Sequence, residues 1–183
     1  MSRFLAIDFD PQGVFVAAGT ARGGAARVEQ VLAWVPGADH GPPALTGDTA
    51  KAIGEQIRDR LKAANIAPAP ALVCVGRDRV IFREATYPPV PPAEEPAVVR
   101  FQVLKELPEN PEDLVLDYVQ LPEPGPDGQR RATVVVVRKD VLAAVQAMCA
   151  AAGLKLAGVT PRPFAVAAGL SAAVAAGRLT PAD

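Results

Sequence analysis

The chain opens with short apolar runs that are separated by turn residues. The first two runs are Phe4–Ile7 and Val14–Ala18, with the turn Asp10-Pro11-Gln12-Gly13 between them, and a third run follows Gly23-Gly24 at 26–35. Proline presets φ for a turn and glycine accepts positive φ, so the chain can reverse at both points. The pattern therefore predicts three consecutive antiparallel strands joined by short turns.

A segment with helical periodicity comes next, and a buried strand follows it. Asp48 can cap a helix that runs from 49 to 65, because apolar residues recur there at intervals of three to four: Ala50, Ile53, Ile57, Leu61 and Ala64. The continuous apolar run Ala71–Gly76 suits a central strand that is buried on both faces. Three antiparallel strands, a helix and a central strand are typical of the start of a ribonuclease-H-like sheet.

A second set of elements interrupts this order after Arg77. The pattern predicts a strand at 80–85, a helix at 96–107 and two further strands at 114–121 and 132–138. In the helix we expect a buried stripe formed by Ala97, Val98, Phe101 and Leu104. The remaining chain predicts a helix at 139–152, a strand at 154–159 and an alanine-rich helix at 164–176. We therefore expect a small α+β module to be inserted in a larger domain.

The composition argues against several classes of partner. Half of the residues are hydrophobic, the formal net charge is −1, and the 19 Lys and Arg residues are spread along the chain. This balance does not favour nucleic acid or an anionic membrane as a partner. The sequence contains no apolar run of the roughly 20 residues that cross a membrane as a helix, and no signal-peptide pattern opens it. We expect a cytoplasmic protein without direct membrane insertion.

Residues with reactive or metal-binding side chains are sparse. Cys74 and Cys149 lie in apolar segments without CxxC spacing, which indicates reduced packing residues. His40 lies in a loop without the converging donors of a metal site, so a solvated loop residue is favoured over a ligand. Asp113 and Asp117 could share one face of a strand, but an acid pair also needs a pocket and a companion nucleophile or base. We therefore predict neither a catalytic nor a metal site.

Several weak motifs occur in a fixed order along the second half of the chain. They are Glu94-Glu95, Phe101–Pro108, Glu112–Tyr118, Ala151–Leu154 and Pro163–Ala165. In this order they resemble the PilM family of type IV pilus assembly proteins, which are relatives of the cell-division protein FtsA and of actin. The resemblance covers nearly the whole chain.

The resemblance implies an α/β fold, namely the first half of an actin-like (ribonuclease-H-like) fold with an inserted subdomain of strand-helix-strand-strand order. Residues 1–76 and 153–183 would form the core subdomain and 77–152 the inserted one. The chain ends where the family's second half begins, so we expect it to correspond to the first half of a longer protein.

The resemblance also implies a function. PilM-type proteins are cytoplasmic scaffolds that are held at the inner membrane through partners, which include other pilus or secretion assembly proteins. They bind the short N-terminal tail of PilN, a single-span inner-membrane protein. By analogy, the tail would bind residues of the inserted strand and helix: Val80, Phe82, Val98, Phe101 and Leu104. Strand addition and apolar pockets would hold it.

The first turn departs from the family's phosphate-binding pattern. By resemblance, Asp8, Asp10, Gln12 and Gly13 would form this site, with Asp8 holding a metal through water. Asp10 replaces a glycine, however, and Pro11 contributes no N–H, so an ordinary hairpin is favoured over a phosphate site. We expect no cofactor in this half. The alternatives left open are an actin-like ATPase or nucleotide switch, whose full-length form binds ATP and Mg²⁺, and the equivalent type II secretion component.

Overall fold

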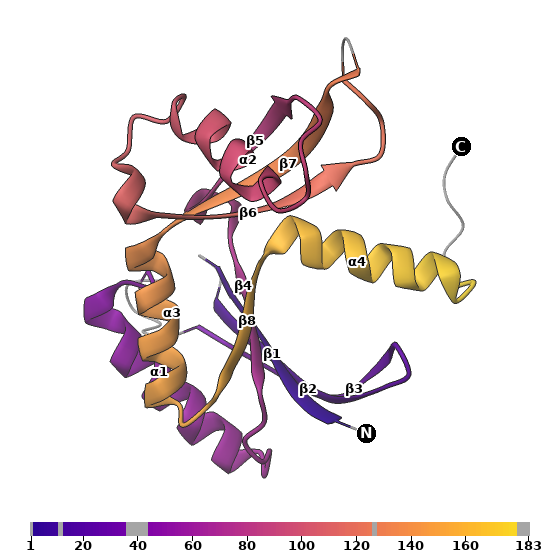
Figure 1. Ribbon diagram of the computed structural model, residues 1–183. Coiled ribbons are helices and arrows are strands. Elements are labelled where there is room, and N and C mark those ends of the chain that lie inside the picture. Colours follow the sequence, from indigo (N-terminus) through magenta and orange to yellow (C-terminus); the bar gives the residue numbers. More distant parts are fainter. Residues whose placement is uncertain (1, 11–12, 36–43, 126–127, 179–183) are drawn as a thin grey trace. The chain divides into compact units, whose positions relative to one another are not determined.

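The computed structural model describes residues 2–10, 13–35, 44–125 and 128–178 (Figure 1). The chain divides into two compact units: unit 1 is Met1–Arg77 with Ala143–Asp183, and unit 2 is Asp78–Leu142. The expected inserted module extended to residue 152, whereas the division of the structure falls at residue 142. The helix that begins at Lys139 therefore belongs mainly to unit 1.

Unit 1 is built on a five-stranded mixed sheet with the strand order β3-β2-β1-β4-β8. The strands are β1 (Ser2–Asp10), β2 (Gly13–Arg22), β3 (Ala25–Trp34), β4 (Ala71–Val75) and β8 (Leu156–Pro161). β1, β2 and β3 pair antiparallel, as the turn residues predicted. β4 pairs parallel with β1, and β8 pairs parallel with β4. The carboxyl ends of β1, β4 and β8 therefore meet at one edge of the sheet.

Two helices, α1 (Gly47–Ala63) and α3 (Lys139–Ala151), cover one face of this sheet (Figure 1). Both helices place apolar side chains in the core, among them Ile53 and Ile57 of α1 and Met148 of α3. The two helices pack closely at Gly54, where an added Cβ would lie 2.3 Å from the Met148 carbonyl oxygen. The close packing with α1 explains why α3 belongs mainly to unit 1.

Capping residues end α3 and begin α1, and the cap of α1 differs from the predicted one. Gly153 follows α3 with φ +70°, and its amide donates to the Ala150 carbonyl at 3.0 Å, as expected for a left-handed cap. The expected cap of α1, Asp48, instead lies in the first turn of the helix. Thr46 is the cap, and it exchanges hydrogen bonds with Thr49 in a capping box.

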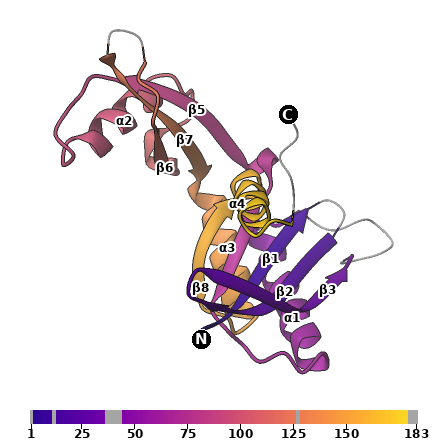
Figure 2. The same ribbon diagram turned by 90° about the vertical axis from the view of Figure 1, so that its right-hand side faces the viewer.

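The last helix, α4 (Arg162–Ala175), lies on the opposite side of the sheet from α1 and α3 (Figures 1 and 2). It contains no fully buried residue, although its composition is strongly apolar. Val166, Leu170 and Val174 keep 53%, 54% and 39% of their accessible surface. The helix therefore packs only partly against the sheet.

Unit 2 has the predicted strand-helix-strand-strand order. Its elements are β5 (Val80–Tyr87), α2 (Glu95–Leu104), β6 (Leu114–Leu121) and β7 (Arg130–Arg138), with short 3₁₀ turns at Arg77–Arg79 and Pro111–Asp113. The strands form a separate antiparallel sheet in the order β5-β7-β6. Its core lies under α2 and contains Ala85, Tyr87, Val99, Val103, Leu107, Leu114, Ala132, Val134 and Val136.

The prediction of the buried stripe of α2 is wrong for Ala97 and Phe101. Phe101 keeps 69% of its surface exposed, and Ala97 is exposed as well. Val99 and Val103, four residues apart, are the buried apolar positions, while Val98 and Leu104 pack at the margin of the core. Apolar residues occur on most sides of this helix, so spacing alone did not identify the side that meets the sheet.

Among the residues that the structure describes, no helix is both long enough and apolar enough to cross a membrane.

Candidate functional site

The first candidate site lies where three parallel strands of unit 1 end. Asp8 of β1 lies beside Cys74 of β4, and Cys74 lies beside Thr160 of β8. α4 begins at Arg162, two positions after Thr160. Ligands of open α/β sheets bind outside the carboxyl ends of parallel strands. The fold therefore places Asp8, identified from the sequence, at a position where ligands commonly bind.

The carboxylate of Asp8 forms a hydrogen-bonded ion pair with Arg162, and the sequence did not predict this contact. Nε and Nη2 of Arg162 donate to Oδ1 of Asp8 at 3.0 and 2.9 Å. Nη2 also donates to the Phe9 carbonyl oxygen at 3.1 Å. The two ionised side chains keep about a third of their surface, 31% for Asp8 and 30% for Arg162.

Of the other residues of the expected phosphate turn, Gly13 alone lies fully within the described residues. The side chain of Asp10, together with Pro11 and Gln12, lies outside the residues that the structure describes, as does His40. Gly13 is described, and an added Cβ there would lie 2.5 Å from the carbonyl oxygen of Trp34. The glycine is therefore required for the approach of β3 to β2, whether or not a phosphate binds nearby.

These residues do not fit a metal–nucleotide bound at Asp8. A metal held through Asp8 needs its carboxylate oxygens, and Oδ1 already accepts two hydrogen bonds from a guanidinium. Arg162 also neutralises the charge that would attract a cation. Within the described parts of the chain, no group of three or more His, Cys, Asp or Glu residues is arranged to hold a metal ion.

The two cysteines have the character of packing residues. Burial raises the pKa of the Cys149 thiol to about 11. Burial also raises the pKa of Cys74, with a further rise from the charge of Asp8 that Arg162 opposes. Both cysteines are free. A raised pKa keeps a thiol protonated and hence a poor nucleophile at neutral pH.

The residues expected to bind a peptide are divided between two faces of the unit 2 sheet. Val98 and Leu104 pack at the margin of the core under α2, and Phe101 is exposed on that helix. Val80 and Phe82 pair with Val137 and Val135, so they belong to the other face. The structure therefore does not bring the five residues together on a single surface of unit 2.

That other face of the unit 2 sheet is largely apolar. We call it the valine face and define it by Val80 and Phe82 of β5, Val135 and Val137 of β7, and Val115 and Val119 of β6, which share it by register. Val115 and Val119 keep 39% and 59% of their surface exposed, whereas Val80 and Val135 are buried, with 8% exposed each. Its outer strand β5 lies at the edge of the sheet, where half of the backbone polar groups are not used within the sheet.

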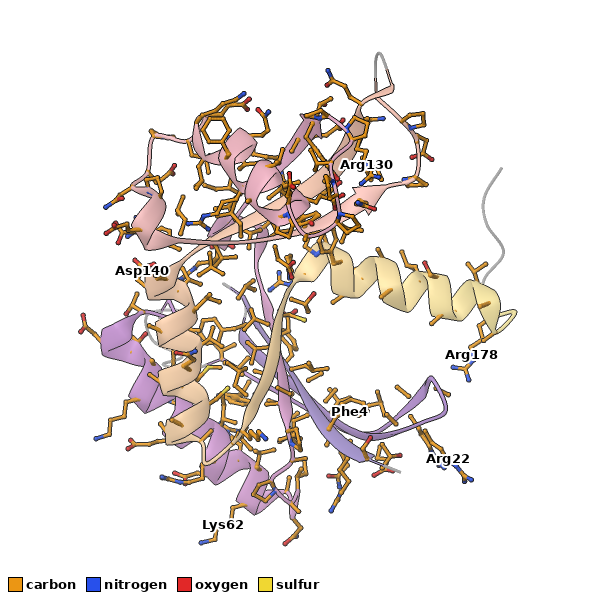
Figure 3. All side chains as sticks on the ribbon, viewed as in Figure 1. Phe4, Arg22, Lys62, Arg130, Asp140 and Arg178 are labelled. Atoms are coloured by element: carbon orange, nitrogen blue, oxygen red, sulfur yellow. The ribbon has the colours of Figure 1, made fainter. Side chains whose placement is uncertain are left out.

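A buried polar cluster around Glu95 lies on the α2 side of the unit 2 sheet, and the sequence did not predict it either. Glu95, 5% exposed, lies in the first turn of α2. It accepts hydrogen bonds from the Tyr118 hydroxyl at 3.0 Å, from Gln120 Nε2 at 2.5 Å and from Arg130 Nη1 at 2.8 Å. Arg130 projects from β7 and is labelled in Figure 3. In the sequence, Glu95 stands out only as part of the Glu94-Glu95 motif.

The hydrogen bonds at Glu95 decide its ionisation. Burial by itself would raise the pKa of this carboxyl group, but the bonds from Tyr118, Gln120 and Arg130 outweigh burial and hold the pKa below its usual range. Burial, followed by the charge of Glu95, raises the pKa of the Tyr87 hydroxyl. The cluster is therefore an ionised carboxylate held by donors from three residues, which is the pattern of a structural anchor.

The chain is similar in fold to solved structures. No family model and no curated protein matches the sequence. Among solved structures, the chain is similar to the PilM–PilN type IV pilus biogenesis complex, with a TM-score of 0.78 and 21% identity over 94% of this chain and 51% of that one. It is also similar to the cytoplasmic domain of EpsL, an inner-membrane component of the Vibrio cholerae type II secretion system. There the TM-score is 0.60 and the identity 16%, over 87% of this chain and 57% of that one.

These similarities confirm the predicted fold. The chain adopts the PilM-type architecture expected from its motifs, and it spans about half the length of the solved structures that it matches. At these identities the similarity defines the architecture alone.

Proposed function

We propose that this chain is the first half of a cytoplasmic adaptor in type IV pilus or type II secretion assembly, and that it binds the N-terminal tail of an inner-membrane partner. The fold shared with the PilM–PilN complex and with EpsL supports this function. In the cell the adaptor would be held at the inner membrane through that partner, with other assembly proteins bound to the same scaffold.

The valine face is the observation that carries the proposal. Its apolar side chains come from all three strands of unit 2, and α2 lies on the other side of the sheet. An extended apolar peptide could pair with the edge of β5 and place alternate side chains on the same face, beside those of Val80 and Phe82. Burial of apolar area contributes about 25 cal/mol per Å², and ordering the tail opposes it, so micromolar affinity is reasonable.

Two phenylalanines of unit 2 provide a matched test. Phe82 belongs to the valine face, whereas Phe101 projects from α2 and is 69% exposed. Fluorescence anisotropy would follow a labelled peptide with the sequence of the partner's N-terminal tail. We expect Phe82→Ala to weaken binding about tenfold, the loss typical of an interface side chain that contributes more than 1 kcal/mol. Phe101→Ala should bind as the wild type does.

The two variants also define the outcomes that oppose the proposal. Equal losses in both variants would remove the valine face from the site, and a loss confined to Phe101→Ala would move the site to α2. If the wild-type chain does not bind the tail of any single-span pilus or secretion partner, the adaptor function is wrong for this half. Circular dichroism of each variant would establish that the fold is retained.

A further inference from the structure

The Asp8 site in unit 1 contains its own cation. One guanidinium makes three hydrogen bonds to the last part of β1, two to the carboxylate of Asp8 and one to the backbone carbonyl of Phe9. Charge-assisted hydrogen bonds of this kind are stronger than neutral ones and fix the orientation of both partners. The contact therefore specifies a geometry as well as a charge balance.

The backbone around Arg162 is constrained by its neighbours. Pro161 ends β8 with φ −61° and ψ 136°, and Pro163 follows Arg162 in the first turn of α4. Proline fixes its own φ and restricts the residue before it. The arginine side chain therefore begins from a constrained position at the junction of β8 and α4.

The reach of the contact suits an arginine. β4 lies between β1 and β8, so the axes of the outer two strands are about 10 Å apart, twice the usual strand spacing. Arg162, two positions after Thr160, spans this interval to reach Asp8 and Phe9. A long side chain with several donors at its end can bond a carboxylate and a carbonyl on the far strand at once.

α4 packs only partly against the sheet. None of its residues is fully buried, and its apolar residues Val166 and Leu170 are more than half exposed. A 14-residue helix is marginal in water when it does not pack against other structure. The contact at its first residue is thus well placed to decide where the helix begins.

We propose that Arg162 takes the place of a bound metal at Asp8. The ion pair holds the first turn of α4 to the carboxyl end of β1, and Asp8 does not bind a metal–nucleotide. A magnesium nucleotide would have to displace the guanidinium before it could use Oδ1. This inference is independent of the peptide partner proposed above, because all of its residues lie in unit 1.

Hydrogen exchange at the start of α4 tests the holding role. The variants are Arg162→Met and Asp8→Ala, which remove one partner each. The control is Arg178→Met, which removes an arginine beyond the far end of the same helix (Figure 3). We expect amide exchange from Ala165 to Gly169 to become about fivefold faster in both test variants, because a partly exposed ion pair contributes of that order. Arg178→Met should leave the exchange there unchanged.

Unchanged exchange in both test variants, or equal acceleration in the control, would overturn the holding role. If Arg162→Met fails to fold, Asp8→Ala still decides the question from the other side of the contact. The metal part is tested on the wild-type chain by calorimetric titration with MgATP. We expect no binding tighter than about 1 mM, equivalent to roughly 4 kcal/mol. A micromolar dissociation constant that Asp8→Ala abolishes would overturn the proposal.

Discussion

The two units each contain a carboxylate bonded to an arginine, and the two pairs differ in almost every other respect. Asp8 in unit 1 keeps 31% of its side-chain surface and receives its side-chain donors from Arg162 alone among the contacts found in the described residues. Glu95 in unit 2 is 6% exposed in its side chain and receives donors from three residues on two strands. Arg130 completes its cluster from β7.

This difference in burial indicates that the Asp8–Arg162 pair mainly positions a helix, whereas the Glu95 cluster mainly stabilises its unit. Water can still solvate Asp8, so loss of Arg162 leaves a charge that is partly hydrated and costs little. Glu95 has exchanged water for protein donors, so its removal leaves several buried polar groups without their acceptor. We therefore expect Glu95 to support the stability of unit 2, and Asp8 to support the placement of α4.

The largest expected effect follows removal of the Glu95 carboxylate. We expect Glu95→Leu to lower the free energy of unfolding by about 3 kcal/mol, because Tyr118 and Gln120 lose their acceptor and Arg130 loses its counter-ion. Urea denaturation monitored by circular dichroism would measure the loss. The neighbouring Glu94→Leu is the control, because Glu94 is exposed and its side chain makes no capping hydrogen bond. Equal losses in the two variants would contradict the anchoring role.

A smaller effect is expected in the pH dependence of stability. The folded-state pKa of Glu95 is lowered, so its contribution is fully present above the ordinary glutamate pKa of about 4.3 and is lost as pH falls through the folded-state value. Wild type should therefore exceed Glu95→Gln in stability at pH 6, and the gap should narrow towards about pH 3. Denaturation series at both pH values would measure it. A gap that stays constant would show that the carboxylate's charge does not contribute.

The smallest effect is expected at Asp8. We expect Asp8→Ala to lower the free energy of unfolding by about 1 kcal/mol or less, since the pair is about one-third exposed. The pair of Glu84 and Arg131 in unit 2 serves as the reference, because the Glu84 side chain is 50% exposed, and Glu84→Gln should leave the unfolding midpoint nearly unchanged. A loss at Asp8 as large as that at Glu95 would remove the distinction between the two sites.

Local elements and their order could be predicted from the sequence because their signals are local. Glycine and proline turns between apolar runs specified the first three strands, and periodic apolar residues specified α1. Gly153 ends α3 for a local reason too, since few residues other than glycine adopt positive φ without strain. The strand-helix-strand-strand order of unit 2 followed from the same patterns, and with the motif order it was sufficient to predict the fold.

Two features could be determined only from the tertiary structure: which residues of α2 are buried, and which residue caps α1. The apolar residues of α2 occur on most sides of the helix, so the position of the sheet selected Val99 and Val103 and left Phe101 in solvent. At α1, Thr46 and Asp48 are both good capping residues, and the exact start of the helix decided between them.

The contacts at the two candidate sites also could be determined only in part from the sequence. The sequence alone determined that Asp8 follows an apolar strand and that its turn lacks the usual phosphate-binding residues. It did not connect Asp8 with Arg162, because the two residues are 154 positions apart and meet only when β8 pairs beside β4. The donors of Glu95 come from 23 to 35 positions away on two strands whose register is set by sheet formation. Such pairs depend on long-range strand register, which a single sequence specifies only through the packing of the whole unit.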